Sequence, residues 1–154
     1  MVRRSVQDIP DNADPVAVRR NLEAAADELN EQIALVEERL SALRLNVTAF
    51  VQFQGRISQM HGYYDGLAFA RYQNSWRLVR EYGPEGDPDE GTTELLSTCS
   101  KEIRAEAMPL LPELYAGLLR AADAEVAKIR AASAEAKAFL NSLPASASQG
   151  RVRA

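Results

Sequence analysis

The chain has 154 residues, of which 46% are hydrophobic, and its formal net charge at pH 7 is −4. This length suits one domain with a buried core, and the mild charge excludes a strong overall attraction to nucleic acid or to anionic membranes. One cysteine, Cys99, excludes an internal disulfide framework. No apolar run approaches the roughly 20 residues of a membrane span, so we expect a cytoplasmic protein.

The N-terminal part of the sequence predicts a flexible arm over 1–13 and then a long helix over 14–62. Asp14 can accept hydrogen bonds from free backbone amides, and Pro15 fits the first helical position. Apolar residues then recur three and four positions apart, the spacing of a coiled coil that needs a partner helix. This series comprises Leu22, Ala26, Leu29, Ile33, Val36, Leu40, Leu43, Val47, Phe50, Gln54 and Ile57.

The apolar face of this predicted helix widens in its second half. A wider face needs a further covering neighbour. We therefore predict a homodimer, with a complex with another protein as the alternative. The predicted oligomer interface comprises Leu45, Phe50, Phe53, Ile57 and Met60.

Two short runs rich in aromatic and aliphatic residues predict a β-hairpin over 66–82. Residues 73–75 read Gln-Asn-Ser and supply a turn, because Asn tolerates the positive φ that a tight turn requires. An even loop length would put the apolar residues of the two strands on one face. These residues are Leu67, Phe69, Trp76 and Leu78.

The segments that follow predict an acidic loop over 83–91 and a second helical region over 92–143. The loop is rich in Gly and Pro, which interrupt helices and strands. Thr92 or Thr93 can cap the start of the helical region. Pro109 and Pro112 each remove a backbone donor, which predicts a kink or a break near Met108 to Pro112. The tail over 144–154 has the composition of a disordered segment.

The alanine-rich part of the second region suggests how the two predicted helices meet. If the chain folds back antiparallel, Ala131 to Ala138 would lie beside Ala24 to Ala26, and small side chains would let the helices approach closely. We therefore expect a mainly α fold. It would have two long antiparallel helices in a coiled-coil hairpin and a small β-hairpin at the tip. One domain over 14–143 would dimerise into a helical bundle.

The sequence shows no catalytic or metal-binding signature, so we expect neither an enzyme nor a cofactor. His61 is the single histidine, which is too few for a di-metal site with two Glu-x-x-His pairs or for a zinc site. We interpret His61 as a polar layer of the coil, or else as a substrate-facing group beside Tyr63, Tyr64 and Asp65. We interpret Cys99 as a buried helical residue.

Arginines alternate with aromatic residues along the predicted hairpin. Such residues dominate the energetics of protein interfaces, and they can also bind phosphates and stack on bases. We expect a non-enzymatic assembly or scaffold protein that presents the hairpin to a protein partner. The alternative is a small nucleic-acid-associated protein that uses the hairpin and the basic tails. The predicted partner-binding residues are Arg71, Tyr72, Trp76, Arg77, Arg80 and Tyr82. The nucleic-acid alternative would use Arg71, Arg77 and Arg80 together with the tail residues Arg3, Arg4, Arg151 and Arg153.

Overall fold

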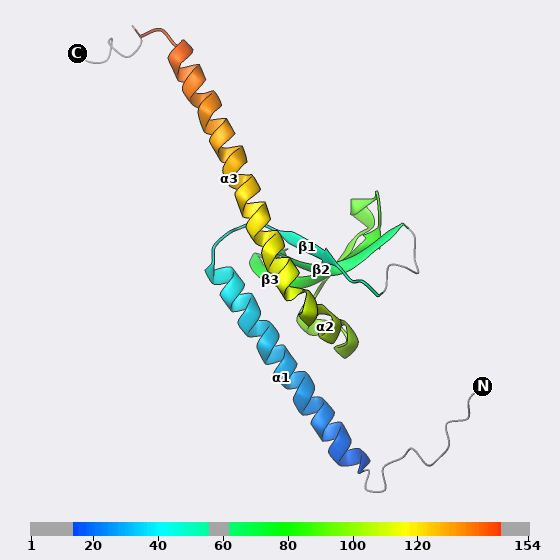
Figure 1. Cartoon of the computed structure of the whole chain (residues 1–154). Coiled ribbons are helices and arrows are strands. Elements are labelled where there is room, and N and C mark those ends of the chain that lie inside the picture. The colour runs from blue at the N-terminus through cyan, green and yellow to red at the C-terminus, as the bar shows by residue number, and fades with distance from the viewer. Residues whose placement is uncertain (1–13, 56–61, 146–154) are drawn as a thin grey trace.

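The computed structural model describes residues 14–55 and 62–145. A four-stranded antiparallel sheet, in the order β1-β2-β3-β4, lies against helices on one of its faces (Figure 1). The elements are α1 (Pro15–Ala42), β1 (Ala49–Gln52), β2 (Tyr63–Tyr72), β3 (Ser75–Pro84), η3 (Pro88–Glu90), β4 (Thr92–Leu95), η4 (Leu96–Thr98), α2 (Lys101–Ala107), η5 (Met108–Leu110) and α3 (Leu111–Ser142).

Helix α1 begins where the sequence predicts and ends much earlier. Asp14 accepts a hydrogen bond from the backbone N–H of Val16 at 3.0 Å, and Pro15 occupies the first helical position. The helix stops at Ala42 after 28 residues. Arg44 and Asn46 follow with positive φ values of 51° and 54°, a backbone conformation that cannot continue a right-handed helix.

The segment after α1 forms strand β1, because its side chains alternate between the core and the solvent. Phe53 is fully buried, whereas Phe50 is 41% exposed. β-branched and aromatic residues, which favour strands, supply this alternation. The helix predicted over 14–62 is therefore wrong beyond Ala42. The apolar residues after Ala42 recur at every second position, as in a strand, and also at every third or fourth position, as in a helix. The strand is the structure that forms. The inward set is Leu45, Val47, Ala49, Val51 and Phe53.

Strands β2 and β3 confirm the predicted hairpin and its even loop. The strands pair from Tyr63 with Pro84 to Tyr72 with Ser75, which leaves a two-residue turn. Gln73 and Asn74 in this turn have φ values of 47° and 69°. Two successive positive φ values match the twist of the flanking strands. The hairpin forms the centre of the sheet and is not a small insertion at a helical tip.

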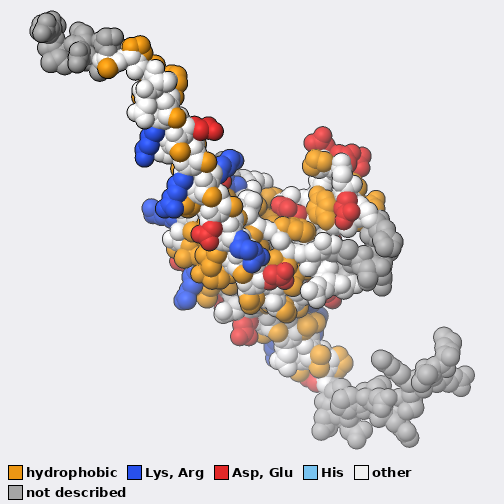
Figure 2. All heavy atoms as spheres, turned by 45° about the horizontal axis from the view of Figure 1, so that its top comes forward, with side chains coloured by type: hydrophobic (Ala, Val, Ile, Leu, Met, Phe, Trp, Pro, Cys, Tyr) orange, Lys and Arg blue, Asp and Glu red, His pale blue; other side chains and the backbone are white. Residues whose placement is uncertain are grey.

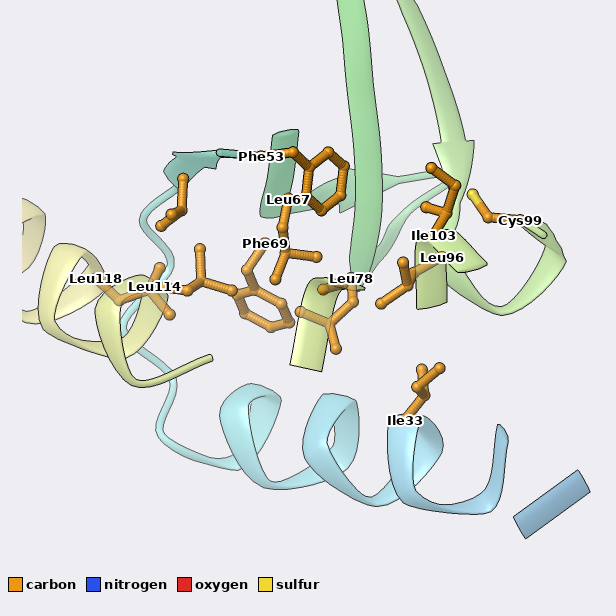
Figure 3. Close-up of a cluster of buried hydrophobic side chains, with 12 residues drawn as sticks. Ile33, Phe53, Leu67, Phe69, Leu78, Leu96, Cys99, Ile103, Leu114 and Leu118 are labelled. Atoms are coloured by element: carbon orange, nitrogen blue, oxygen red, sulfur yellow. The ribbon is translucent and has the colours of Figure 1, made fainter. Parts of the chain in front are cut away.

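The hydrophobic core lies between the inner face of the sheet and the helices (Figure 3). Leu67 and Leu78 project from the sheet and are fully buried, and Phe69 is 4% exposed. Ile33 of α1 and Leu114 of α3 cover them and are also fully buried. The sheet thus covers Ile33, a member of the heptad series for which the sequence predicted a partner helix.

The second half of the chain departs from the predicted helical hairpin. Thr92 begins strand β4, which pairs with β3, and the α-helical part starts only at Lys101. The predicted break is confirmed, because the short 3₁₀ segment η5 separates α2 from α3. Arg104 of α2 donates a hydrogen bond to Asn30 Oδ1 of α1 at 2.5 Å, which ties these two helices together.

The long helices α1 and α3 do not form the predicted coiled-coil hairpin. α1 lies against β3, whereas α3 lies against β1 and β2. Residues 131–138, which were expected to meet Ala24 to Ala26, are exposed throughout. The mainly α class, the coiled coil and the helical bundle are therefore wrong for this chain. A sheet with one apolar face provides the cover that the second helix was expected to supply.

The alternating burial along β1 and at Phe53, the residue directly after it, gives a direct test of the strand. Phe53→Ala should lower the free energy of unfolding by about 3–5 kcal/mol, because it removes a fully buried aromatic side chain. The matched change Phe50→Ala should cost less, about 1–2 kcal/mol, because this side chain is 41% exposed and loses only part of its packing. Urea unfolding followed by circular dichroism measures both. Equal losses of unfolding free energy in the two variants would contradict the alternating burial of a strand in this segment.

Candidate protein-interaction site

Two of the three hairpin arginines are engaged within the chain. Arg77 donates from Nε to Glu37 of α1, whose side chain is only 9% exposed. Arg80 makes a two-point contact with Asp65, with Nε to Oδ1 at 2.9 Å and Nη2 to Oδ2 at 2.8 Å. Such charge-assisted pairs fix the side chains that make them. Both guanidinium groups are therefore held by carboxylates of the same chain, although the Arg77 side chain is still 36% exposed.

Arg80 belongs to a polar cluster at one end of the inner sheet face. Its guanidinium lies 4.3 Å from the ring centroid of Tyr82, and the Tyr82 hydroxyl donates to Glu94 Oε1 at 2.9 Å. This hydrogen bond raises the pKa of Tyr82. Burial, together with the nearby Glu94 carboxylate, raises the pKa of the Cys99 thiol to about 11. A thiol with this pKa is a poor nucleophile at neutral pH.

The other predicted hairpin residues lie at the turn end of β2 and β3. Trp76 is half-buried and stacks on Phe69, with ring centroids 5.7 Å apart and planes at 27°. Arg71 is exposed and lies directly across from Trp76, whereas Tyr72 is half-buried. Tyr82 is six residues from Trp76 on β3, about 20 Å away at the rise of a strand. The six predicted residues therefore do not form one surface.

The predicted oligomer interface is also dispersed. Phe53 belongs to the core, Leu45 is half-buried against it, and Phe50 lies on the outer sheet face. Gly66 gives the Phe50 ring its space there, since a Cβ at Gly66 would lie 2.6 Å from that ring. Ile57 and Met60 lie outside the described residues, as does His61. The described members of this set therefore share no helix face.

The groups proposed as chemically active have other roles where the structure describes them. Asp65, suggested as a neighbour of His61, is the partner of Arg80. Cys99 is 8% exposed and lies next to Glu94, with Sγ 3.6 Å from Oε2. Over residues 14–55 and 62–145, no group of three or more His, Cys, Asp or Glu side chains could hold a metal ion.

The most exposed apolar surface lies instead on the second half of α3. Residues 123–143, which we call the α3 arm, are exposed at every position. The arm projects from the body at the end opposite to the start of α1, with apolar side chains between charged ones on its surface (Figures 1 and 2). Large side chains on the arm are Val126, Ile129, Phe139, Leu140 and Leu143, which are 45%, 61%, 64%, 64% and 46% exposed.

Aliphatic and small residues of α3, together with Leu143 directly after its last residue, repeat at alternating intervals of three and four. Such spacing places all members on one side of a helix, and we call this side the arm stripe. Its one polar member is Ser133, whose hydroxyl can donate to a carbonyl of its own helix and so occupy little space in a packed layer. The arm stripe comprises Leu119, Ala122, Val126, Ile129, Ser133, Ala136, Leu140 and Leu143.

The sequence had pointed to this region for a different reason. Its alanines predicted a contact within the chain, with Ala24 to Ala26 of α1. The pattern that indicates a free surface is the arm stripe itself. It continues to Leu143, whereas the contact of α3 with the sheet ends near Leu118. Only the length of the sheet shows that the arm stripe extends beyond the residues that α3 needs to cover it.

The polar sides of the arm mix acidic and basic residues, such as Glu135 and Lys137. Helices that lie on anionic membranes carry polar faces rich in Lys and Arg, whereas acidic and basic residues are equally frequent on this arm. None of the helices within the described ranges is long and apolar enough to cross a membrane.

Comparison with protein-family models, with curated proteins and with solved structures found no match to this chain. The arm stripe is therefore the candidate site on geometry alone.

The pairing of Arg77 predicts which hairpin arginine matters for stability. Arg77→Ala should lower the free energy of unfolding by about 2 kcal/mol, because it leaves the buried Glu37 carboxylate without its cation. Arg71→Ala, a matched change at an exposed position, should change it by less than about 0.5 kcal/mol. Denaturant titration compares them. An equal, small effect of both changes would contradict a structural role for Arg77.

The environment of Cys99 predicts slow thiol chemistry. In the folded chain, iodoacetamide should react little at pH 8, and the rate should rise at higher pH, because the pKa of the thiol is raised to about 11. Glu94→Gln should increase the rate at pH 8, because it removes a negative charge that raises this pKa. Mass spectrometry follows the modification, and urea-unfolded protein is the control. Rapid modification of the folded chain at pH 8 would contradict the burial.

Proposed function

We propose that this chain is a non-enzymatic assembly protein whose α3 arm binds a helix of a protein partner through the arm stripe. The observation that supports this most strongly is the arm itself. It is a helix exposed at every position from Asp123 onwards, yet it carries regularly spaced aliphatic residues. A cytoplasmic location remains a prediction.

An arm without a partner would leave its apolar side chains in water at a cost in free energy. Helices in proteins gain most of their stability from packing of an apolar face. Leaving Ile129 and Leu140 in water forfeits roughly 1.5–3 kcal/mol per side chain relative to full burial. A helix needing no partner would gain nothing from this regular stripe. The spacing of three and four also matches the packing surface that a second helix requires.

The nucleic-acid alternative receives less support from the geometry. Phosphate binding requires cations that are free to meet the backbone. Arg77 and Arg80 already pair with carboxylates, and of the three hairpin arginines Arg71 is the exposed one. On the arm, basic and acidic residues are equally frequent. This alternative therefore remains a prediction from the sequence, without a surface that favours it.

The test compares two double variants that differ only in which side of the arm they change. The stripe variant is Val126→Glu with Leu140→Glu, and the control is Ala124→Glu with Ala138→Glu on the opposite side. Tagged chains would be purified from the source cells, which also express the untagged chain. Crosslinks from Lys128 and Lys137, mapped by mass spectrometry, identify what touches the arm.

We expect wild type and control to retain a protein crosslinked to the arm, where an untagged copy of this chain counts as such a protein. The stripe variant should lose it at least tenfold, because carboxylates in an apolar contact are unfavourable. All four positions are exposed, so every variant should keep the circular dichroism and melting of the body. Retention of every crosslinked protein by the stripe variant would overturn the proposed function.

A further inference from the structure

We propose that the partner of the α3 arm is the α3 arm of a second copy of this chain, in an antiparallel pair with two-fold symmetry. This inference rests on the proposed function, because it names the partner of the same surface. The symmetry axis would pass between the two arms at the height of Ala131, so that Ile129 of one copy meets Ser133 of the other.

The sizes of the side chains along the arm stripe select this alignment. With Ile129 opposite Ser133, every small residue of the stripe faces a large aliphatic one, and packing at nearly constant volume fills each layer. The end layers join two leucines. The layers are Leu119 with Leu143, Ala122 with Leu140, Val126 with Ala136, and Ile129 with Ser133, and each occurs twice by symmetry.

Antiparallel alignments shifted by one heptad lose this complementarity. A shift in one direction puts Ala122 opposite Ser133, and a shift in the other puts Ser133 opposite Ala136. Two facing small residues leave a gap between helices that larger residues elsewhere hold apart, and unfilled volume is destabilising. The same shifts place two large residues together, such as Val126 with Ile129. The proposed alignment therefore packs better than its neighbours.

A parallel pair in register has the same defect. Each residue would face its own copy, so that Ala122, Ser133 and Ala136 would form three layers of small residues between layers of paired leucine, isoleucine and valine. Such alternation of thin and thick layers cannot be filled at one distance between the helices. Side-chain size therefore favours the antiparallel direction.

Charges that flank the stripe are compatible with pairing of two copies. In the antiparallel pair, Asp123 would lie near Lys137 of the other copy, and the symmetry repeats this contact. Arg130 lies closest to the axis, where it would face Arg130 of the other copy. The pair would therefore have two favourable contacts between Asp123 and Lys137 and one unfavourable contact between the two arginines. In a parallel pair, Glu125 would instead lie near Arg130 twice. Charge thus supports a second copy as the partner, whereas side-chain size sets the direction.

The length of the free helix matches the same alignment. From Leu119 to Leu143 the stripe runs about 36 Å at the rise of an α-helix. In the pair, Leu143 of one copy lies beside Leu119 of the other, where the arm leaves the body. α3 ends at Ser142, and residues 123–143 are exposed at every position. The paired region thus covers the exposed length and stops where the body begins.

Other exposed apolar surfaces fit a second copy less well. The outer part of α1 exposes Val16, Val18 and Leu22, at 56%, 60% and 51%, but these residues span about two turns. On the outer sheet face, Phe50 is 41% exposed and lies opposite the small residue Ala68. Neither surface offers several layers that repeat by symmetry.

The first experiment measures the mass of the purified 154-residue chain by sedimentation equilibrium from about 1 to 200 μM. We expect twice the 16.9 kDa mass of one chain at the upper concentrations. Ala136→Glu should weaken the dimer at least tenfold, because each dimer would place two carboxylates in apolar layers. Ala138→Glu, the same change on the opposite side of the arm, should leave it unaffected. A monomer at 200 μM, or equal dimers for both variants, would overturn the proposal.

The second experiment tests direction and alignment with single introduced cysteines. A mixture of Val126→Cys and Ala136→Cys chains should form crosslinked dimers of unlike chains with a short bismaleimide. Each variant alone should react much less, because like positions would lie ten residues apart, or about 15 Å along the helix axis. The wild-type chain controls for the buried Cys99. Strong crosslinking of each variant with itself is the pattern of a parallel pair and would overturn the alignment.

These results also separate the two proposals. A monomeric chain whose arm still crosslinks to another protein, in a manner that depends on the stripe, would overturn self-pairing and leave the proposed function standing. A monomeric chain whose arm crosslinks to nothing would overturn both.

Discussion

The inner face of the sheet must be covered, and this requirement organises the whole chain. Leu67, Phe69 and Leu78 lie on that face and are buried. A sheet with one apolar face is stable only against another layer. Ile33 of α1 and Leu114 of α3 provide that layer from distant parts of the sequence. Strand β1 can pair with β2 only because α1 ends at Ala42 and the chain changes direction in the next few residues.

The helices that supply this cover are longer than the contact with the sheet requires. Strands β2 and β3 have 10 residues each, or about 33 Å. α3 has 32 residues, or about 48 Å, and its buried residues, Leu114 and Leu118, lie near its start. The excess length becomes the α3 arm. The hydrophobic core is complete without the arm, because the buried residues of α3 all lie before it.

The sequence predicted those features that depend on local chemistry. The start of α1 follows from Asp14-Pro15, the turn of the hairpin from Asn74, and the break before α3 from Pro109. Each is decided by residues within a few positions of one another. The core face of the hairpin also followed, since alternation along a strand fixes which side chains share a face.

Features that depend on distant contacts were missed. The segment from Leu45 to Phe53 satisfies both a helical and a strand spacing, and pairing with β2 decides between them. Thr92 can cap a helix, but it pairs with the edge of β3 instead. The partners of Arg77 and Arg80 are 40 and 15 residues away. No local pattern assigns these partners, so the predicted binding surface could not be distinguished from ordinary ion pairs.

We propose that the α3 arm is bare in a single chain and covered when two chains pair. Amide hydrogen exchange of residues 123–142, measured as the protein concentration is raised, tests this most directly. We predict fast exchange in dilute solution and slower exchange as the arms pair, with no slowing in Ala136→Glu. Exchange over these residues that is equally fast at every concentration, or that slows equally in that variant, would show that the arms do not pair through the arm stripe.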